Sequence, residues 1–291
     1  MKTTKIKSIN KPILFCLMSL FLFCMYSCCN KECGDKKSGD KYDVAAYFWP
    51  AYHDEERSRE VFWRQGIGEW EIIKQGDPRF EGHYQPRIPL WGYEMDDDPE
   101  VMEKKIDAAT DHGINVFIFD WYWYDGKPLL EESLNEGFLK AKNAEMMKFY
   151  LMWANHDVWG YQWNHNIYKP DTILWQGEVD WTNFRLLVDR VIKQYFKQPC
   201  YYRIDDKPVF SLWSIIELVQ SFNGLDGTKK ALDYFRQEVE KAGFKGLHIQ
   251  LSGYNYGKDG RPQLLPETLA EGKSVNEIVS ELGINSITTY N

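Results

Sequence analysis

Short apolar runs recur along the chain, and each of them ends in aromatic and polar residues. The clearest is residues 115–124, NVFIFDWYWY. Its first half is β-branched and aromatic without a polar break, which is typical of a strand buried on both faces. Its second half puts Asp120 beside three large rings where the strand runs out. A core strand gains nothing from that ending. A sugar-binding surface does, because rings cover the apolar faces of a pyranose while a carboxylate holds its polar edge.

These apolar runs alternate with segments of helical pattern. Asp98-Pro99, for example, supplies an N-cap and a first-turn proline, and His112-Gly113 closes the same helix. Strict alternation of β and α segments predicts a parallel sheet covered by helices. The expected strands are residues 44–49, 116–122, 148–153, 208–213, 247–251 and 286–290, and the expected helices are residues 98–112, 130–146, 180–197, 228–242 and 275–282.

The repeated order of helix, glycine and apolar run favours a barrel over an open sheet. A closed barrel of this kind has eight strands, whereas the count along this chain reaches the sixth strand at its last residues. We therefore expect an α/β fold, a (β/α)8 TIM-type barrel truncated after strand 6, without a sharp cooperative melt as a monomer. An open doubly wound sheet is the alternative, although no Gly-rich phosphate turn follows the first strand.

Residues 1–27 have the pattern of a bacterial lipoprotein signal peptide. Lysines precede an apolar stretch, residues 13–26, that is too short to span a bilayer comfortably. The stretch is followed by a small residue and Cys28, as in a lipobox, so Cys28 is the expected lipidation site. Residues 28–41 are expected to form a flexible tether, and residues 42–291 the incomplete barrel. We expect a lipid-anchored protein of the cell envelope, at the bacterial outer membrane.

Composition excludes several classes of function. The formal charge of −8 and the absence of a basic stripe exclude nucleic acid as a partner. The histidines are scattered and no HExxH or paired-cysteine motif occurs, so no metal is expected. No P-loop or Gly-x-Ser-x-Gly motif occurs either, no cofactor is expected, and no protein partner can be identified. Only Cys29, Cys33 and Cys200 remain for pairing after processing, which predicts no disulfide framework.

The candidate site residues lie where functional side chains of a (β/α) barrel lie, at the carboxyl ends of strands and in the loops after them. The candidates for catalysis are the carboxylates Asp120, Glu69 and Asp157. Glu69 belongs to a long first loop whose Trp and Pro content argues against disorder. The candidates for substrate binding are His53, Trp70, Trp121, Trp123, Trp153, Asn155, His156 and Tyr254.

Each candidate also has a structural interpretation. Side chains alternate along a strand, so one of Trp121 and Trp123 is expected to pack against helices outside the barrel. Asp120 could accept hydrogen bonds from backbone N–H groups, and His156 and Asp157 could cap the loop that follows them. The convergence of the whole set on one rim is what favours a site.

Four stretches of the chain carry a family resemblance: YFWPAYH (47–53), GEWEIIKQGDPRFEGHYQPRIPLWGYE (68–94), DPEVMEKKIDAATDHGINVFIFDWYWYDG (98–126) and KFYLMWANHDVW (148–159). On these motifs, the chain from Ala45 onward resembles a bacterial family related to glycoside hydrolase family 99, the endo-acting α-mannosidases and mannanases. Some relatives are labelled glycosyltransferases of O-antigen clusters. The resemblance implies a (β/α)8 barrel that acts on α-mannosides or similar glycans with retention, through a 1,2-anhydro sugar and two carboxylates.

Two departures from the family pattern bear on catalysis. Relatives carry an Asn-Glu-Trp…Glu-Gly motif that supplies the paired Glu residues, and this sequence has no Asn-Glu-Trp. Many relatives also read Trp-Ala-Asn-Glu where this chain has Trp153-Ala154-Asn155-His156. We therefore expect impaired catalysis, with Asp120 as an orienting or charge-stabilising group.

The expected function is that of a glycoside hydrolase-like lipoprotein whose partner is an oligo- or polysaccharide of the α-mannoside type or a related glycan. Two alternatives stay open. A glycosyltransferase of surface polysaccharide synthesis would need a sugar donor, and no nucleotide-sugar motif is recognisable. A noncatalytic glycan-binding lipoprotein would bind mannan without hydrolysing it.

Overall fold

The computed structural model describes residues 42–252, 255–256 and 262–290, all of which belong to one compact unit. The expected signal peptide, the lipidation site Cys28 and the tether lie outside the described residues. Tyr254, a candidate for substrate binding, lies outside them as well.

The core of the unit is a sheet of six parallel strands that pair in the order in which they occur along the chain. The predicted parallel α/β architecture is therefore confirmed, with β2 extended at its carboxyl end by a short antiparallel partner, β3 (Lys127–Leu129). The six strands are β1 (Ala45–Phe48), β2 (Val116–Tyr124), β4 (Lys148–Trp153), β8 (Lys207–Leu212), β9 (His248–Ser252) and β12 (Ser286–Thr288).

The sheet is curled into a half-barrel. Four strand spacings separate β1 from β9, which in a flat sheet would amount to about 19 Å. Instead, the Tyr47 hydroxyl on β1 donates a hydrogen bond to Ser252 Oγ on β9 (3.3 Å). The Tyr47 ring also lies 4.4 Å from the ring of Tyr290, which follows β12. Side chains on the concave face thus meet across the curl, which is the geometry of a (β/α) barrel.

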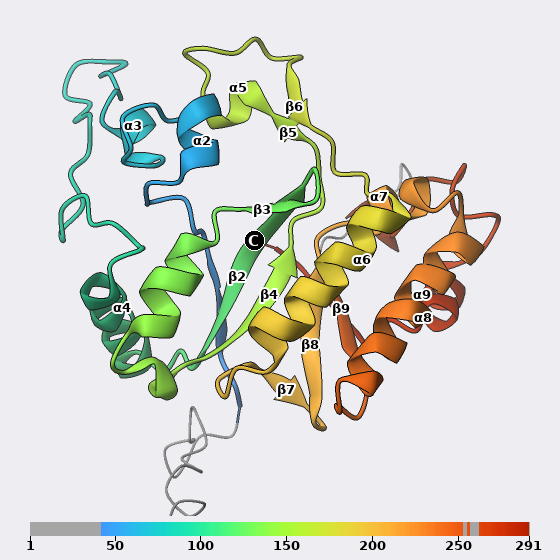
Figure 1. The fold of residues 1–291 in the computed structure, drawn as a ribbon. Helices are drawn as coiled ribbons and strands as arrows, with labels where there is room; N and C mark the ends of the chain where they lie inside the picture. Colours follow the sequence, from blue (N-terminus) through green and yellow to red (C-terminus); the bar gives the residue numbers. More distant parts are fainter. Residues whose placement is uncertain (1–41, 253–254, 257–261, 291) are drawn as a thin grey trace, which may run out of the picture. The chain divides into compact units, whose positions relative to one another are not determined.

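Helices connect successive strands, and α6 crosses in front of β4 and β8 (Figure 1). Helix α9 begins with a capping box between Ser274 and Glu277 and ends at Gly283, which has a φ of 62°. At α4 the Asp98 side chain accepts a hydrogen bond from the Glu100 N–H (2.8 Å). The main helices are α4 (Pro99–Asp111), α6 (Trp181–Arg190), α8 (Leu225–Lys241) and α9 (Val275–Leu282).

The helix expected over residues 130–146 is wrong. That segment forms a π-helical turn, η1 (Ser133–Gly137), and two 3-10 turns, η2 (Phe138–Lys140) and η3 (Ala144–Met146). At Gly137 a Cβ would lie 2.0 Å from the carbonyl oxygen of Asp96, so this backbone is packed against the long first loop. Tertiary contact there overrides the helical pattern.

The predicted helix 180–197 is divided, since α6 passes into a π-helical segment, η4 (Val191–Phe196).

Several short elements were not predicted. They are the helices α2 (Glu56–Val61), α3 (Trp70–Ile73), α5 (Gly160–Trp163) and α7 (Ile216–Ser221), and the strands β5 (Val158–Trp159), β6 (Ile173–Trp175), β7 (Arg203–Ile204), β10 (Asn255–Tyr256) and β11 (Pro262–Gln263).

Two further findings concern disulfide bonding and membrane-spanning helices. Cys200 is disulfide-bonded. Within the part of the chain that the structure describes, no helix is both long and apolar enough to cross a membrane.

Candidate functional site

A cavity of about 270 Å³ lies at the carboxyl-terminal ends of the parallel strands. Strands β2 and β4 contribute side chains directly, and the segments that follow β1, β4, β8 and β12 complete the wall. This is the edge at which (β/α) barrels place their functional groups. The wall consists of Trp49, Trp63, Glu69, Asp120, Tyr122, Met152, Ala154, His156, Gln162, Trp163, Trp213 and Tyr290.

The alternation of side chains along β2 decides which of its residues reach this cavity. Asp120 and Tyr122 line it. Trp121 lies on the other face of the strand, where its Nε1 donates a hydrogen bond to the buried carboxylate of Glu131 (2.7 Å). Trp123 is on that outer face too, stacked on Trp121 with ring centroids 5.7 Å apart. Both indoles therefore lie between the sheet and the outer layer and away from the cavity. The expectation that alternation would send only one of them outward was wrong, because residues two apart on a strand share a face.

Asp120 is the most perturbed carboxyl group of the cavity. Its side chain is 4% exposed, and burial raises its pKa to about 7, although a hydrogen bond from the Tyr290 hydroxyl to Oδ2 (3.0 Å) opposes that rise. Its other oxygen, Oδ1, is buried without a hydrogen-bond partner among the described residues. A carboxyl group in this state can hold a proton near neutral pH and give it up inside the cavity.

Glu69 is the second carboxyl group of the cavity wall. Burial raises its pKa, and the hydrogen bond that Trp49 Nε1 donates to Oε2 (2.5 Å) acts in the opposite direction. The chain reaches this position through Gly68, which has a φ of +57° and packs so tightly that a Cβ would lie 2.1 Å from the Ala51 carbonyl oxygen. The Glu69 N–H donates to that same carbonyl (2.9 Å), so the first loop fixes Glu69 over the strand ends.

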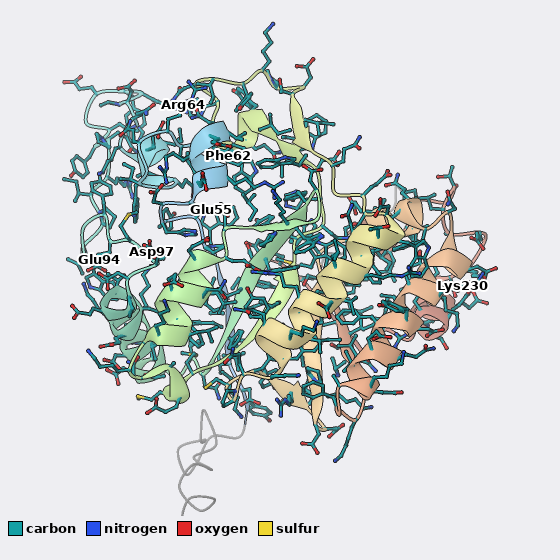
Figure 2. The ribbon with its side chains drawn as sticks, viewed as in Figure 1. Glu55, Phe62, Arg64, Glu94, Asp97 and Lys230 are labelled. Carbon is teal, nitrogen blue, oxygen red and sulfur yellow. The ribbon has the colours of Figure 1, made fainter. Side chains whose placement is uncertain are left out.

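Aromatic rings form most of the remaining wall. The Trp63 and Trp163 rings stack at 5.6 Å, and Tyr122 meets Trp163 edge-on at 5.5 Å. Phe62, which directly follows α2 (Figure 2), stacks on Trp163 with ring centroids 4.7 Å apart. Indole and phenol rings pair apolar faces with polar tips. The cavity thus joins two carboxyl groups to flat apolar walls.

His156 also lines the cavity. Its ring lies edge-on to Tyr122 and Trp213, with centroid distances of 6.0 and 6.2 Å. Of the residues expected from the sequence to form a site, the structure therefore brings Asp120, Glu69 and His156 together around one cavity.

The other expected residues after β4 hold the loop that carries His156. Asn155 Nδ2 donates to the Ser214 carbonyl (2.6 Å), and its Oδ1 accepts from the Ser214 N–H (2.9 Å). Asp157 Oδ1 accepts from the Gly177 N–H (2.9 Å). Trp153 is buried on the outer face of β4, with its ring 6.5 Å from Phe184 of α6. Their assignment to substrate binding or catalysis stays a prediction.

His53 and Trp70 belong to a separate part of the first loop. His53 is fully buried, with Nε2 3.4 Å from a carboxylate oxygen of Glu132. Trp70 stacks on Tyr52 at 4.1 Å and donates its N–H to the Glu94 carbonyl (2.8 Å). Neither side chain lines the cavity, and their role in binding likewise stays a prediction.

Most of the aromatic wall was missed as a candidate site. The signal for Tyr122 was present, because Asp120 and Tyr122 are two residues apart and must share a face of the strand. Trp49 and Trp213 could also have been found, since each is the last residue of a predicted strand. Trp63 could not, because its position depends on how the long loop folds back.

Within residues 42–252, 255–256 and 262–290, no group of three or more His, Cys, Asp or Glu side chains is arranged to hold a metal ion.

The fold and cavity define an α/β protein of the (β/α) barrel type with an acidic, aromatic-walled site. The family described as Glycosyltransferase WbsX matches residues 44–273. The chain belongs to that family, and the expected family relationship is confirmed.

The chain is also similar to curated proteins and solved structures. The uncharacterized protein WxcX of Xanthomonas campestris pv. campestris strain B100 is 28% identical over 172 residues, 58% of this chain, which spans only 24% of that relative. Similar solved structures are a GH99 endo-α-mannosidase from Bacteroides thetaiotaomicron in complex with Bis-Tris-propane (13% identity, TM-score 0.45, 85% of this chain and 58% of the other) and a glycoside hydrolase-like protein (14%, 0.40, 75% and 53%). At these TM-scores the structural likeness adds nothing to the topology described above.

Proposed function

We propose that this protein binds a glycan of the α-mannoside type, or a related glycan, in the cavity and hydrolyses a glycosidic bond there. The observation that carries the proposal is the presence of two carboxyl groups with raised pKa values, the buried Asp120 and the half-buried Glu69, in one aromatic-walled cavity. Pairs of carboxyl groups are the usual catalysts of glycoside hydrolysis, and ring walls suit the faces of a sugar. The volume, about 270 Å³, is at the small end for ligand sites and suits one sugar unit.

Asp120 would act as the acid. A pKa of about 7 leaves much of this group protonated near neutral pH, which an acid catalyst needs. As the bond between the anomeric carbon and the glycosidic oxygen breaks, that oxygen would take the Asp120 proton. Water would then add its hydroxyl group to the anomeric carbon and give its proton back to the Asp120 carboxylate. Glu69, when ionised, would stabilise the positive charge that develops at the anomeric carbon. The resemblance implies retention, which ¹H NMR of the first-formed product anomer tests.

Glycosyl transfer is the second candidate, favoured by the description of the family. A nucleotide-sugar donor carries a diphosphate, which proteins commonly hold with Lys or Arg. Among the described residues that line the cavity there is no Lys or Arg, and two carboxyl groups face the ligand instead. Hydrolysis is therefore the better-supported proposal. Turnover that requires a nucleotide sugar would reverse that order, and glycan binding without turnover would indicate a noncatalytic protein.

The test is the substitution Asp120→Asn, assayed on mannan and aryl α-mannosides. We expect turnover or glycan binding to fall at least tenfold, because the amide can neither donate the acid proton nor carry charge. Asp189→Asn is the matched control, since Asp189 is an exposed residue of α6 paired with Lys193 (2.7 Å). Unchanged kinetics in Asp120→Asn would remove Asp120 from the mechanism. The same assay on the wild type tests the expected impairment.

The melting temperature separates lost chemistry from lost folding. Because the folded-state pKa of Asp120 is raised from 3.8 to about 7, its ionisation opposes folding, and stability falls as the pH rises between those two values. Removing the charge should therefore leave the melting temperature of Asp120→Asn at or above that of the wild type at pH 8. A lower value would mean that the loss of activity comes from unfolding.

A further inference from the structure

His156 has a defined protonation pattern in this structure. Its Nδ1 lies 2.8 Å from the backbone carbonyl oxygen of Asp157. A carbonyl oxygen can only accept a hydrogen bond, so Nδ1 must carry the proton. In the neutral ring Nε2 is then left with its lone pair, as an acceptor.

The backbone around His156 is held from several sides. The Tyr124 hydroxyl donates to the His156 carbonyl (2.9 Å). Gly177 packs so closely that a Cβ there would lie 2.7 Å from the His156 carbonyl carbon, and its N–H binds the Asp157 side chain (2.9 Å). The Asn155–Ser214 pair before it also holds the backbone, and the Nδ1 hydrogen bond to the Asp157 carbonyl sets the orientation of the ring. The acceptor is pre-organised before a ligand arrives.

The polar groups of the cavity favour a particular ligand chemistry. His156 Nε2 has no hydrogen-bond partner among the described residues and lies on a side chain that lines the cavity. Asp120 and Glu69 contribute carboxyl oxygens to the same wall. This set accepts hydrogen bonds from hydroxyl groups, whereas a phosphate or carboxylate on the ligand would face two acidic groups without a Lys or Arg from the described lining.

We propose that His156, through Nε2, accepts a hydrogen bond from one particular hydroxyl group of a neutral sugar, and that the cavity selects neutral over anionic sugars. His156 is thus a specificity-determining residue. The inference rests on the proposed function as far as the ligand is a sugar, while the protonation pattern of His156 rests on the structure alone.

The first test measures that pattern without any ligand. Long-range ¹H–¹⁵N NMR spectra at pH 8 should show His156 as the Nδ1–H tautomer, with its signals identified by their absence in His156→Gln. His165→Gln, a change at an exposed residue, should leave those signals in place. A His156 ring protonated on Nε2 in the free protein would overturn the inference whatever the activity.

The second test identifies the hydroxyl group. Binding of methyl α-D-mannopyranoside and its monofluoro analogues, one for each hydroxyl, is measured by tryptophan fluorescence, since four Trp side chains line the cavity. Fluorine cannot donate a hydrogen bond. Fluorination at one position should weaken binding to the wild type about tenfold, but not to His156→Ala. Mannose 6-phosphate should bind the wild type at least tenfold more weakly than the neutral sugar.

The outcomes separate this inference from the proposed function. If the wild type binds the neutral sugars and no fluorinated position depends on His156, the inference is wrong and the proposed function stands. Equal or tighter binding of mannose 6-phosphate would refute the selectivity for neutral sugars. If the wild type binds none of these sugars, the proposed function fails and the ligand part of the inference fails with it.

Discussion

Asp120 exchanges most of its hydration for one hydrogen bond from Tyr290 and contacts with rings. Burial favours the neutral acid and the phenol hydroxyl favours the carboxylate, and burial has the larger effect, because the pKa is raised to about 7. Tyr290 is itself positioned by its ring contacts with Tyr47 (4.4 Å) and Trp213 (4.8 Å). The protonation state of Asp120 therefore depends on residues from both edges of the sheet.

This dependence gives a prediction for Tyr290→Phe. The ring contacts are kept while the hydrogen bond to Asp120 is lost, so the pKa of Asp120 should rise above about 7. An acid catalyst is active below its pKa, and the alkaline limb of the pH profile of kcat should therefore move to higher pH, by up to roughly one unit. A limb that stays in place or moves to lower pH would show that Tyr290 does not control Asp120.

At the scale of elements, the position of the first loop depends on one close backbone contact. Glu69 is in the cavity only because the loop turns back at Gly68 to meet Ala51. That turn requires both a positive φ and the absence of a Cβ.

Gly68→Ala should therefore displace Glu69 from the cavity and lower glycan affinity or turnover at least tenfold, with several degrees lost from the melting temperature. Gly82→Ala is the matched control. Gly82 lies in the same loop with a φ of +80°, but nothing lies within 4 Å of its added Cβ, so only about 1 kcal/mol of stability should be lost. Equal effects on binding in the two variants would show that the close approach at Gly68 has no functional role.

At the scale of the whole molecule, the N-terminal pattern predicts how the protein is held in the cell, and we propose that a lipid on Cys28 anchors it to the envelope. Cys28→Ala should abolish incorporation of labelled fatty acid and move the protein from the membrane fraction to the soluble fraction. Cys29→Ala is the control that tests the neighbouring cysteine. A membrane-bound Cys28→Ala variant would show that another feature of the chain provides the attachment.

The elements followed from the sequence wherever local signals agreed with each other. Residues 275–282 were expected to be helical, and α9 has those bounds because a capping box and a terminal glycine define it. Residues 130–146 had a helical pattern as well, yet the packing of Gly137 against Asp96 broke it into short turns. A contact between residues so far apart leaves no trace in local periodicity.

The candidate site divides in the same way. Strand ends placed Asp120 and His156 on one rim. Because side chains alternate along β2, Asp120 faces the cavity and Trp121 faces the outer layer. The sequence could not show which face of β2 points into the cavity, because apolar residues occupy both faces. Nor could it place Glu69, whose position depends on a long loop.

By itself, the sequence determined the parallel α/β order of strands and the rim on which polar and aromatic residues gather, since both depend on short-range periodicity. The tertiary structure decided which of those residues face a common cavity, the raised pKa of Asp120 and the free nitrogen of His156. These depend on the curl of the sheet and on burial, which arise only when distant segments pack together.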